Sequence, residues 1–389
     1  MPHPLRGATA IVGIGLGGQT NGVLGEAPGR SGLEIMGEAV QNALADAGLS
    51  IKDVDGLFTA DMMTAVPALV IGEYLGLKPK VASGSNLGGS SFVAHLLWAA
   101  LALTHGLCDT ALICFGSNQR TRPGGRGAQR PEIPWWLAPY RPRPPVSGYA
   151  LAAARHMYEY GTTREHLSEV AVAARQWAAL NPEAFLREPL THEEVSASRL
   201  IADPLRKLDC CLVTDGGGAV ILTRSDRAKD FPHRPAHVLG VAAAQHHMQV
   251  SEMPDLTTSA AADSGPRAFG MAGLEPADVD VVQLYDAFTI NTIMFLEDLG
   301  FCKKGEGGAF VENGAIAPGG RLPVNTNGGG LSCVHPGMYG IFLLVEAVRQ
   351  LRGTCGERQV KDAKVALTHG NGGQLSSQVT ALLGTEEAV

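Results

Sequence analysis

The sequence has no excess of basic residues and no long uninterrupted apolar run. Its 31 Lys and Arg are outnumbered by 38 Asp and Glu, for a formal net charge of -7, so we do not expect it to bind nucleic acid. Gly, His or charged residues break every apolar stretch before the ~20 residues that a membrane-spanning helix needs. The first residues lead directly into a strand-like run, and we expect no signal peptide and no membrane association.

Cysteine is present, but not in the arrangement of a zinc site or a disulfide framework. The seven cysteines are an odd number, and no pair has Cys-x-x-Cys spacing. His246 and His247 are adjacent, and neighbouring strand side chains point to opposite faces, which argues against a shared metal. The glycines at 13–18 lack the later glycine and the acidic ribose ligand of a dinucleotide site. We therefore expect reduced thiols, a cytoplasmic location, no metal and no bound cofactor.

Glycine and apolar residues dominate the rest of the composition. The 389 residues include 49 Gly, and 45% are hydrophobic against 18% charged. This composition is typical of a globular α/β enzyme in which tight turns join strands to helices. The length predicts more than one ordinary hydrophobic core.

An internal repeat accounts for much of this length. AGLSIKDVD at 47–55 and AGLEPADVD at 272–280 each follow a helical segment and precede a short apolar strand. Each half then has a Gly- and Ser- or Asn-rich turn that opens an apolar helix, at 83–103 and 325–351, followed by a buried strand. Such a pattern predicts two related β–α–β–α–β halves, with sheets covered on both faces.

The segment between the two copies is longer than the repeat requires. It begins with a Pro-, Arg- and Gly-rich loop and continues with amphipathic helices at 150–160 and 164–180, so we interpret it as an insertion. The expected domains are an N-terminal half at 1–119 and 209–230, an inserted loop domain at 120–208, and a C-terminal half at 231–389.

Six motifs spread over nearly the whole chain carry a family resemblance. They are HMYEYGTTREHL (156–167), ASRLIADPLRKLDCCLVTDGGGAVIL (197–222), YDAFT (285–289), GGGLSCVHPGMYG (328–340), EAVRQLRG (346–353) and HGNGGQLS (369–376). Together they resemble the thiolase superfamily, in its branch of sterol-carrier-protein-X and lipid-transfer proteins. The resemblance implies the αβαβα layered thiolase fold, with a helical loop-domain insertion in the first half.

Thiolases make or break a carbon–carbon bond next to a CoA thioester. Family members use an acylated Cys at a helix start, a His in a Gly-His-Pro motif, and a second Cys in a Cys-x-Gly motif that moves the α-proton. An Asn in an Asn-Glu-Ala-Phe motif holds a water at the oxyanion hole. These parts supply the nucleophile, the proton shuttle and the donors that a developing enolate requires.

The nucleophilic Cys is missing from this chain. Counting back from the helix-ending Gly106 places Gly89 where the family has its Cys. Ser90 and Ser91 follow, and we interpret them as part of the helix start, with a serine nucleophile as the alternative. Cys333 is a candidate for a displaced nucleophile, although a Cys in an apolar turn is more often inert packing.

The other three positions of the family carry chemically capable side chains. His335, in CVHPG, retains the family's His, and His369 stands in place of the second Cys, where imidazole can act as acid or base. Tyr285 replaces the Asn and could supply its phenol as a donor or proton carrier. Asp286 could orient a neighbouring group or cap the next helix. The turn expected to face the oxyanion contains Gly89, Ser90, Asn371 and Gly372.

Loss of the Cys removes covalent acyl transfer and leaves a site that can activate a thioester. Aldol or retro-aldol cleavage of a β-hydroxyacyl-CoA needs no acyl-enzyme, and Cys-less members of the branch include aldolases that shorten sterol or bile-acid side chains. The resemblance implies such a lyase, with Tyr285 and His369 moving protons and His335 polarising the thioester. The alternatives are an acyltransferase of the acetyl-CoA acetyltransferase type and a non-catalytic subunit of a thiolase-like complex.

The resemblance also implies ligands and partners. Coenzyme A would enter as part of the substrate, and in thiolases the inserted domain covers it. Trp135 and Trp136 of the insertion could stack on adenine or face a partner, and arginines could pair with the phosphates. These arginines are Arg120, Arg122, Arg126, Arg130, Arg141 and Arg143. Family members form homodimers, and the Cys-less ones work with a small partner built from an OB fold and a zinc ribbon.

Overall fold

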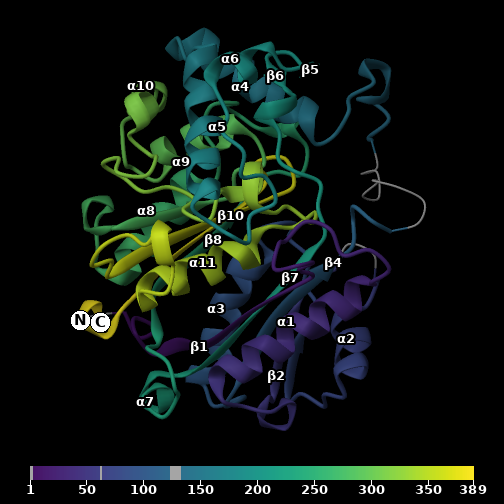
Figure 1. Cartoon of the computed structure of the whole chain (residues 1–389), viewed down its shortest axis with the longest axis vertical. Coiled ribbons are helices and arrows are strands. Elements are labelled where there is room, and N and C mark those ends of the chain that lie inside the picture. The colour runs from purple at the N-terminus through teal and green to yellow at the C-terminus, as the bar shows by residue number, and fades with distance from the viewer. Residues whose placement is uncertain (1–2, 62–63, 123–132) are drawn as a thin grey trace.

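The computed structural model describes residues 3–61, 64–122 and 133–389. Its main sheet has nine strands in the order β3-β2-β4-β7-β1-β8-β11-β10-β9. Strands β1, β2, β4, β7, β8 and β10 of this sheet are labelled in Figure 1. The first five are β3 (Val81–Ser83), β2 (Gly56–Thr59), β4 (Ala111–Ser117), β7 (Gly216–Arg224) and β1 (Thr9–Gly17). The other four are β8 (Ala236–Gln245), β11 (Ser377–Gly384), β10 (Val365–Gly372) and β9 (Val281–Leu284). The two groups meet where β1 pairs with β8.

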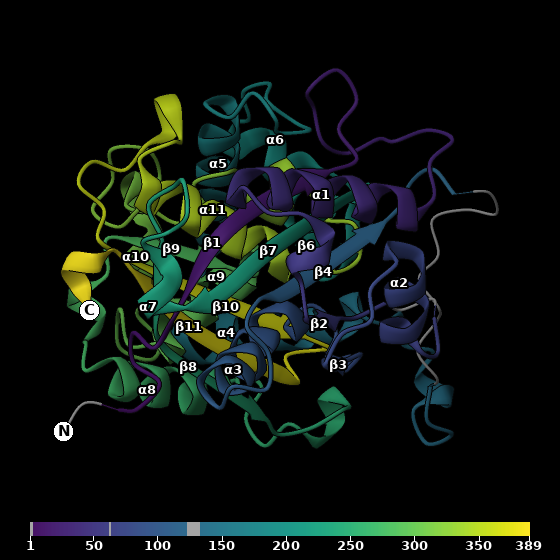
Figure 2. The same ribbon diagram turned by 90° about the horizontal axis from the view of Figure 1, so that it is seen from below.

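Helices cover both outer faces of the strands and also lie between the two groups. Helix α1 (Gly32–Ala47) packs on β1, β7 and β4, while α8 (Ala261–Ala272) packs on β8 and β11 at the opposite side (Figure 2). The central helices α3 (Ser91–Thr104) and α11 (Gly340–Arg352) contact each other and strands of both groups. The expected αβαβα layering is therefore confirmed.

The glycines of β1 allow α1 to pack at very short range. A Cβ added to Gly15 would lie 2.2 Å from the carbonyl oxygen of Ala39, and one added to Gly17 would lie 2.2 Å from that of Ile35. Gly15 and Gly17, within the glycine-rich run at 13–18, therefore serve helix–strand packing.

The two repeated segments form the same local structure. In each copy the helix ends at a left-handed glycine, Gly48 with φ 68° and Gly273 with φ 63°. A 3-10 turn follows, at Ile51–Asp53 or Pro276–Asp278, and leads into β2 or β9. Each half contains a further strand beyond the five expected elements. In the first half β7 pairs antiparallel with β4, and in the second half β11 pairs antiparallel with β10. The first half also contains α2 (Pro67–Leu75), before β3.

The insertion is helical, as expected. It holds α4 (Val146–Tyr160), α5 (Arg164–Ala179), α6 (His192–Ala197) and the small sheet of β5 (Leu200–Ala202) with β6 (Leu205–Arg206). Helix α5 contacts α9 (Thr289–Asp298) and the segment Gly329–Cys333, so the insertion adjoins the second half near its Gly-rich turn. The domain boundaries themselves stay predictions. None of the helices in the described residues is long and apolar enough to cross a membrane.

Candidate active site

The turn that opens α3 touches the turn that follows β9. Gly89 lies two residues before α3, and Tyr285 directly follows β9. A Cβ added to Gly89 would lie 2.2 Å from Cε2 and 2.3 Å from the hydroxyl oxygen of Tyr285. A side chain at residue 89 is therefore incompatible with this position of the phenol. Tyr285 fills the space in which the family resemblance places a nucleophilic Cys.

His335 lies beside the same phenol. The two rings meet edge to face, with centroids 5.4 Å apart and planes at 89°. Thr214 fixes the His335 backbone, because its Oγ1 accepts from the His335 N–H at 2.8 Å and its N–H donates to the His335 carbonyl at 3.3 Å. The Nε2 atom of His335 is buried and has no hydrogen-bond partner among the described residues. Such an atom is costly unless a ligand satisfies it, so we interpret Nε2 as a substrate-facing group.

Tyr339 contacts both Tyr285 and His335, and it was not predicted from the sequence. Its backbone N–H donates to the Tyr285 hydroxyl oxygen at 3.2 Å, and its ring stacks on His335 at 6.1 Å. Its own hydroxyl donates to Asn327 Oδ1 at 3.0 Å. The available signal was an aromatic residue between Met and Gly, directly after the His-Pro-Gly run.

Burial determines the protonation states of Tyr285 and His335. It raises the pKa of Tyr285 well above its usual value of 10, so the phenol keeps its proton. It lowers the pKa of His335 to about 4, so the imidazole is uncharged at neutral pH. Because the Tyr285 oxygen already accepts from the Tyr339 N–H, its own proton can be donated to a ligand. Tyr285 therefore offers a hydrogen-bond donor, and the uncharged His335 offers a proton acceptor.

Asp286 holds the segment that leads to His335. Its carboxyl oxygens accept from the N–H of Gly330 at 2.6 Å and of Leu331 at 3.3 Å. Burial raises the pKa of Asp286 to about 7. The next helix, α9, starts at Thr289, and its N-cap residue Phe288 makes no side-chain cap hydrogen bond. Of the two roles considered for Asp286, the structure supports orientation rather than capping.

His369 is not brought to Tyr285 and His335. Its Nδ1 lies 2.9 Å from Thr380 Oγ1, and its Nε2 lies 2.8 Å from Gln378 Oε1. The ring packs against Phe295 of α9, so its side chain faces the outer helix layer. Burial lowers its pKa to about 4. Both ring nitrogens thus have protein partners, which argues against direct contact of His369 with the substrate.

The residues that alternate with His369 face α3 instead. A Cβ on Gly370 would lie 3.0 Å from the Cα of Ser90, and one on Gly372 would lie 1.7 Å from the carbonyl oxygen of Leu87. Ser90 is fully buried, and its hydroxyl bonds to Leu87 O and Ser377 Oγ at 2.8 and 2.9 Å. The Ser90 hydroxyl therefore links the segment before α3 to the start of β11. Asn371 lies on the His369 side of the strand, as described below.

Cys333 lies at a small cavity beside Glu183 and Arg349. Its thiol is 1% exposed and accepts from Asn181 Nδ2 at 3.6 Å. Burial raises the pKa of Cys333 far above the usual range of a thiol. A thiol held in its protonated form is a poor nucleophile, so this environment does not favour the displaced-nucleophile hypothesis.

The aromatic residues expected to meet CoA or a partner lie at the surface. Trp135 and Trp136 are 81% and 48% exposed, and their rings pack edge to face. Tyr140, which was not among the expected residues, is 82% exposed. Arg120 is engaged within the chain, by an ion pair with Glu26 at 2.6 Å. Arg126 and Arg130 lie outside the described residues.

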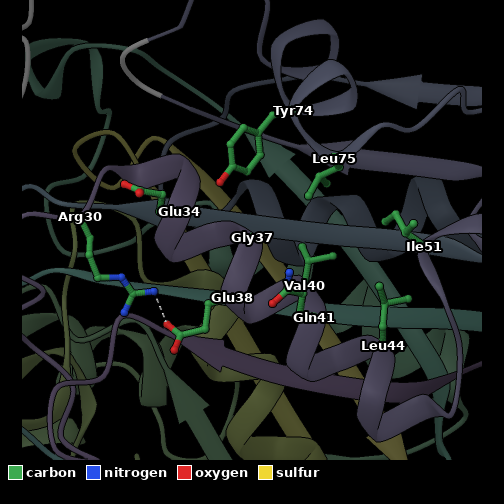
Figure 3. Close-up of a pocket in the computed structure, with 10 residues that line it drawn as sticks. All are labelled: Arg30, Glu34, Gly37, Glu38, Val40, Gln41, Leu44, Ile51, Tyr74 and Leu75. Carbon is green, nitrogen blue, oxygen red and sulfur yellow. Dashed lines mark hydrogen bonds and ion pairs between the residues drawn. The ribbon is translucent and has the colours of Figure 1, made fainter.

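A hollow of about 690 Å³ lies on the outer side of α1, beside α2 (Figure 3). Arg30 and Glu38 form an ion pair at one end of it, with 2.6 Å between their charged atoms. Because α1 covers the outer face of the sheet, this hollow is separate from the turns that hold Tyr285.

Comparison with known proteins gives a consistent result. Residues 242–385 match the family of thiolase C-terminal domain-like sequences. The chain is 37% identical over 394 residues to the steroid side-chain-cleaving aldolase of Thermomonospora curvata, covering 95% of this chain and 96% of that protein. It is 36% identical over 351 residues to the acetyl-CoA acetyltransferase of Methanothermobacter thermautotrophicus, covering 87% and 91%.

Solved structures agree with these matches. The structure of an Ltp2-ChsH2(DUF35) aldolase matches with a TM-score of 0.89 and 34% identity, covering 98% of this chain and 99% of that one. The similarity to enzymes extends over nearly the whole length, in sequence and in fold. The chain therefore belongs to the thiolase superfamily, in the branch of the sterol-carrier-protein-X and lipid-transfer proteins.

Proposed function

We propose that the chain is a carbon–carbon lyase that cleaves a β-hydroxyacyl-CoA by a retro-aldol reaction without an acyl-enzyme. The observation that carries this proposal is the Tyr285 phenol, which fills the place of the missing Cys beside His335. The Nε2 atom of His335 has no hydrogen-bond partner in the part of the chain that the structure describes. The similarity to a steroid side-chain-cleaving aldolase supports it.

A retro-aldol cleavage needs a base for the β-hydroxyl and a donor for the enolate. The uncharged His335 takes the hydroxyl proton at Nε2, and the Cα–Cβ bond then breaks. The β-carbon becomes a carbonyl, while the bonding electron pair enters the thioester enolate. The Tyr285 hydroxyl donates to the enolate oxygen. The proton on His335 then passes to Cα, so the products are a carbonyl compound and a shorter acyl-CoA, and no co-reactant is consumed.

This scheme assigns the proton transfer to His335, whereas the sequence reasoning gave it to Tyr285 and His369. The reason is the protonation and contacts of each group. Tyr285 keeps its proton at neutral pH, because burial raises its pKa, and His369 already has partners at both nitrogens. Tyr285 takes the carbonyl-polarising role that had been expected for His335.

We propose that the chain forms a homodimer and works with a small OB-fold and zinc-ribbon partner. In the main sheet β3 is an edge strand, and the neighbouring α2 region exposes Leu69 and Tyr74, which supports a dimer contact along this edge. The similar aldolase structure names a second component, ChsH2(DUF35). The exposed Trp135 and Tyr140 are a surface that such a partner could cover.

The decisive experiment offers a panel of β-hydroxyacyl-CoA thioesters with secondary and tertiary hydroxyls, with and without the partner. Mass spectrometry should detect the carbonyl product and the shortened acyl-CoA. Tyr285→Phe should lower kcat by about 10²- to 10³-fold, as expected for the loss of an oxyanion donor. Tyr158→Phe, at a residue that is 83% exposed, is the matched control and should change nothing.

The same assay separates the other functions. Thiolysis of a 3-ketoacyl-CoA by free CoA, without cleavage of any β-hydroxyacyl-CoA, would support the acyltransferase alternative, which the similarity to an acetyl-CoA acetyltransferase favours. Unchanged turnover by a complex that contains Tyr285→Phe or His335→Gln would identify a non-catalytic subunit.

A further inference from the structure

A chain of buried hydrogen bonds joins β10 and β11 to α4 of the insertion. His369 Nε2 bonds to Gln378 Oε1 at 2.8 Å, and Gln378 Nε2 donates to Asn371 Oδ1 at 2.7 Å. Asn371 Nδ2 donates to the Tyr149 hydroxyl at 2.7 Å, and that hydroxyl donates to the Gly373 carbonyl at 3.0 Å. All four side chains are at most 2% exposed. The chain thus ends at a single hydroxyl supplied by the insertion.

Tyr149 is held so that its hydroxyl can make both bonds at once. Its ring packs against Phe288, three residues after Tyr285, with centroids 4.4 Å apart. Burial raises the pKa of Tyr149 to about 12, so the hydroxyl stays protonated over the neutral range. It can therefore donate to Gly373 while it accepts from Asn371. Asn371 lies in the last part of β10, and Gly373 directly follows the strand.

The opposite side of this segment, residues 370–373, packs closely against the residues that precede α3. Gly372 packs so tightly that an added Cβ would lie 1.7 Å from the carbonyl oxygen of Leu87. The segment that begins at Leu87 contains Gly89, which touches the phenol of Tyr285. The backbone N–H of Tyr285 also donates to the His369 carbonyl at 3.0 Å. A shift of residues 370–373 must therefore change the space that surrounds the phenol.

We propose that Tyr149 is a positioning residue for Tyr285. Its hydroxyl holds residues 370–373, at the end of β10, against the 87–89 segment and so keeps the phenol where it can donate to the enolate. This inference rests on the proposed function of Tyr285. Because the Tyr149 hydroxyl is occupied by protein partners and not by substrate, its loss lowers kcat and changes KM little.

The test compares Tyr149→Phe in two backgrounds of the full-length protein. In the otherwise native chain it should lower kcat about 10-fold, because a small misplacement of a reacting group is costly, with KM within about twofold. In the Tyr285→Phe background it should lower kcat no further, since the group that it positions is gone. An equal fall of kcat in both backgrounds would overturn the proposal and show a general structural effect.

A second measurement needs no turnover, so it separates failure of this inference from failure of the proposed function. The protein is labelled with tyrosine carrying ¹³C at Cζ, and the Tyr285 signal is assigned from its absence in Tyr285→Phe. Tyr149→Phe should shift this signal, whereas Tyr158→Phe on the exposed side of the same helix should not. An unshifted Tyr285 signal in Tyr149→Phe would overturn the proposal, whether or not any β-hydroxyacyl-CoA is cleaved.

Discussion

The phenol of Tyr285 and a side chain at residue 89 exclude each other. Gly89 is in contact with the phenol, and an added Cβ would lie 2.3 Å from its hydroxyl oxygen. A Cys at this place, as in the acyl-transferring members of the superfamily, would require the phenol to move. The loss of the nucleophile and the gain of the phenol therefore form one structural change.

Gly89→Ala tests this relationship directly. The new methyl group should displace the phenol and lower kcat by at least about 10²-fold, as a 1 Å misplacement can. Overpacking of a dense site should also lower the free energy of unfolding by about 1–3 kcal/mol. Steady-state kinetics and denaturant unfolding measure the two effects.

The matched control is Gly270→Ala, because among the described residues no atom beyond the neighbouring backbone of α8 lies within 4 Å of a Cβ at this residue. Replacement of a helix-interior glycine should stabilise the protein by roughly 0.5–1 kcal/mol. A double-mutant cycle should show that Gly89→Ala costs less stability when Tyr285 is replaced by Ala. Additive effects would show that the two residues do not compete for space.

The uncharged state of His335 predicts the pH dependence of cleavage. Its pKa is lowered to about 4 by burial, so the base is lost only when the pH falls toward that value. The acid limb of kcat/KM, which reports the free enzyme, should therefore lie near pH 4–5 rather than at about 6.5. Because the pKa of Asp286 is about 7, the profile is also measured in Asp286→Asn, and a limb near pH 6.5 that persists in this variant would contradict the proposed base. In His335→Gln the residual rate should show no such limb.

Local signals in the sequence were sufficient to predict the repeated elements. Both AGL segments end a helix at a glycine that adopts positive φ, and the following acidic residues close a 3-10 turn. Each of these interactions spans only a few residues, so the sequence of each copy determines its structure. The close contact of Gly89 with Tyr285 depends instead on residues far apart in the chain, and only the resemblance pointed toward it.

The direction of the His369 side chain could not be read from the sequence. A one-residue change in strand register reverses the face to which a side chain points, and apolar alternation normally reveals that face. In HGNGG three glycines remove this pattern, so His369 was expected at the site although it faces α9. The aromatic Tyr339 could have suggested the ring contact with His335, but its bond to Tyr285 comes from the backbone N–H and does not depend on residue type.

Alkylation tests whether any Cys takes part. Cys333 is buried, and burial raises its pKa, so iodoacetamide should leave it unmodified in the native protein. Activity should survive treatment, and mass spectrometry after digestion should find Cys333 labelled only when the protein is first denatured. Inactivation that parallels labelling of Cys333 would support a displaced nucleophile and contradict the Cys-independent scheme.

The buried carboxyl of Asp286 predicts an unusual dependence of stability on pH. Burial raises its pKa from 3.8 to about 7, so the native state retains a proton that the unfolded chain loses. Its contribution to stability is complete below about pH 4 and is lost as the pH rises toward 7. The free energy of unfolding of Asp286→Asn, measured relative to the unsubstituted protein, should therefore rise over this range. The difference in the free energy of unfolding should change by at most about 1.4 kcal/mol per pH unit.

Denaturant titrations of both proteins at half-unit steps of pH measure this difference. Because all other titrating groups are common to both proteins, a difference that stays constant with pH would mean that Asp286 is ionised in the native state.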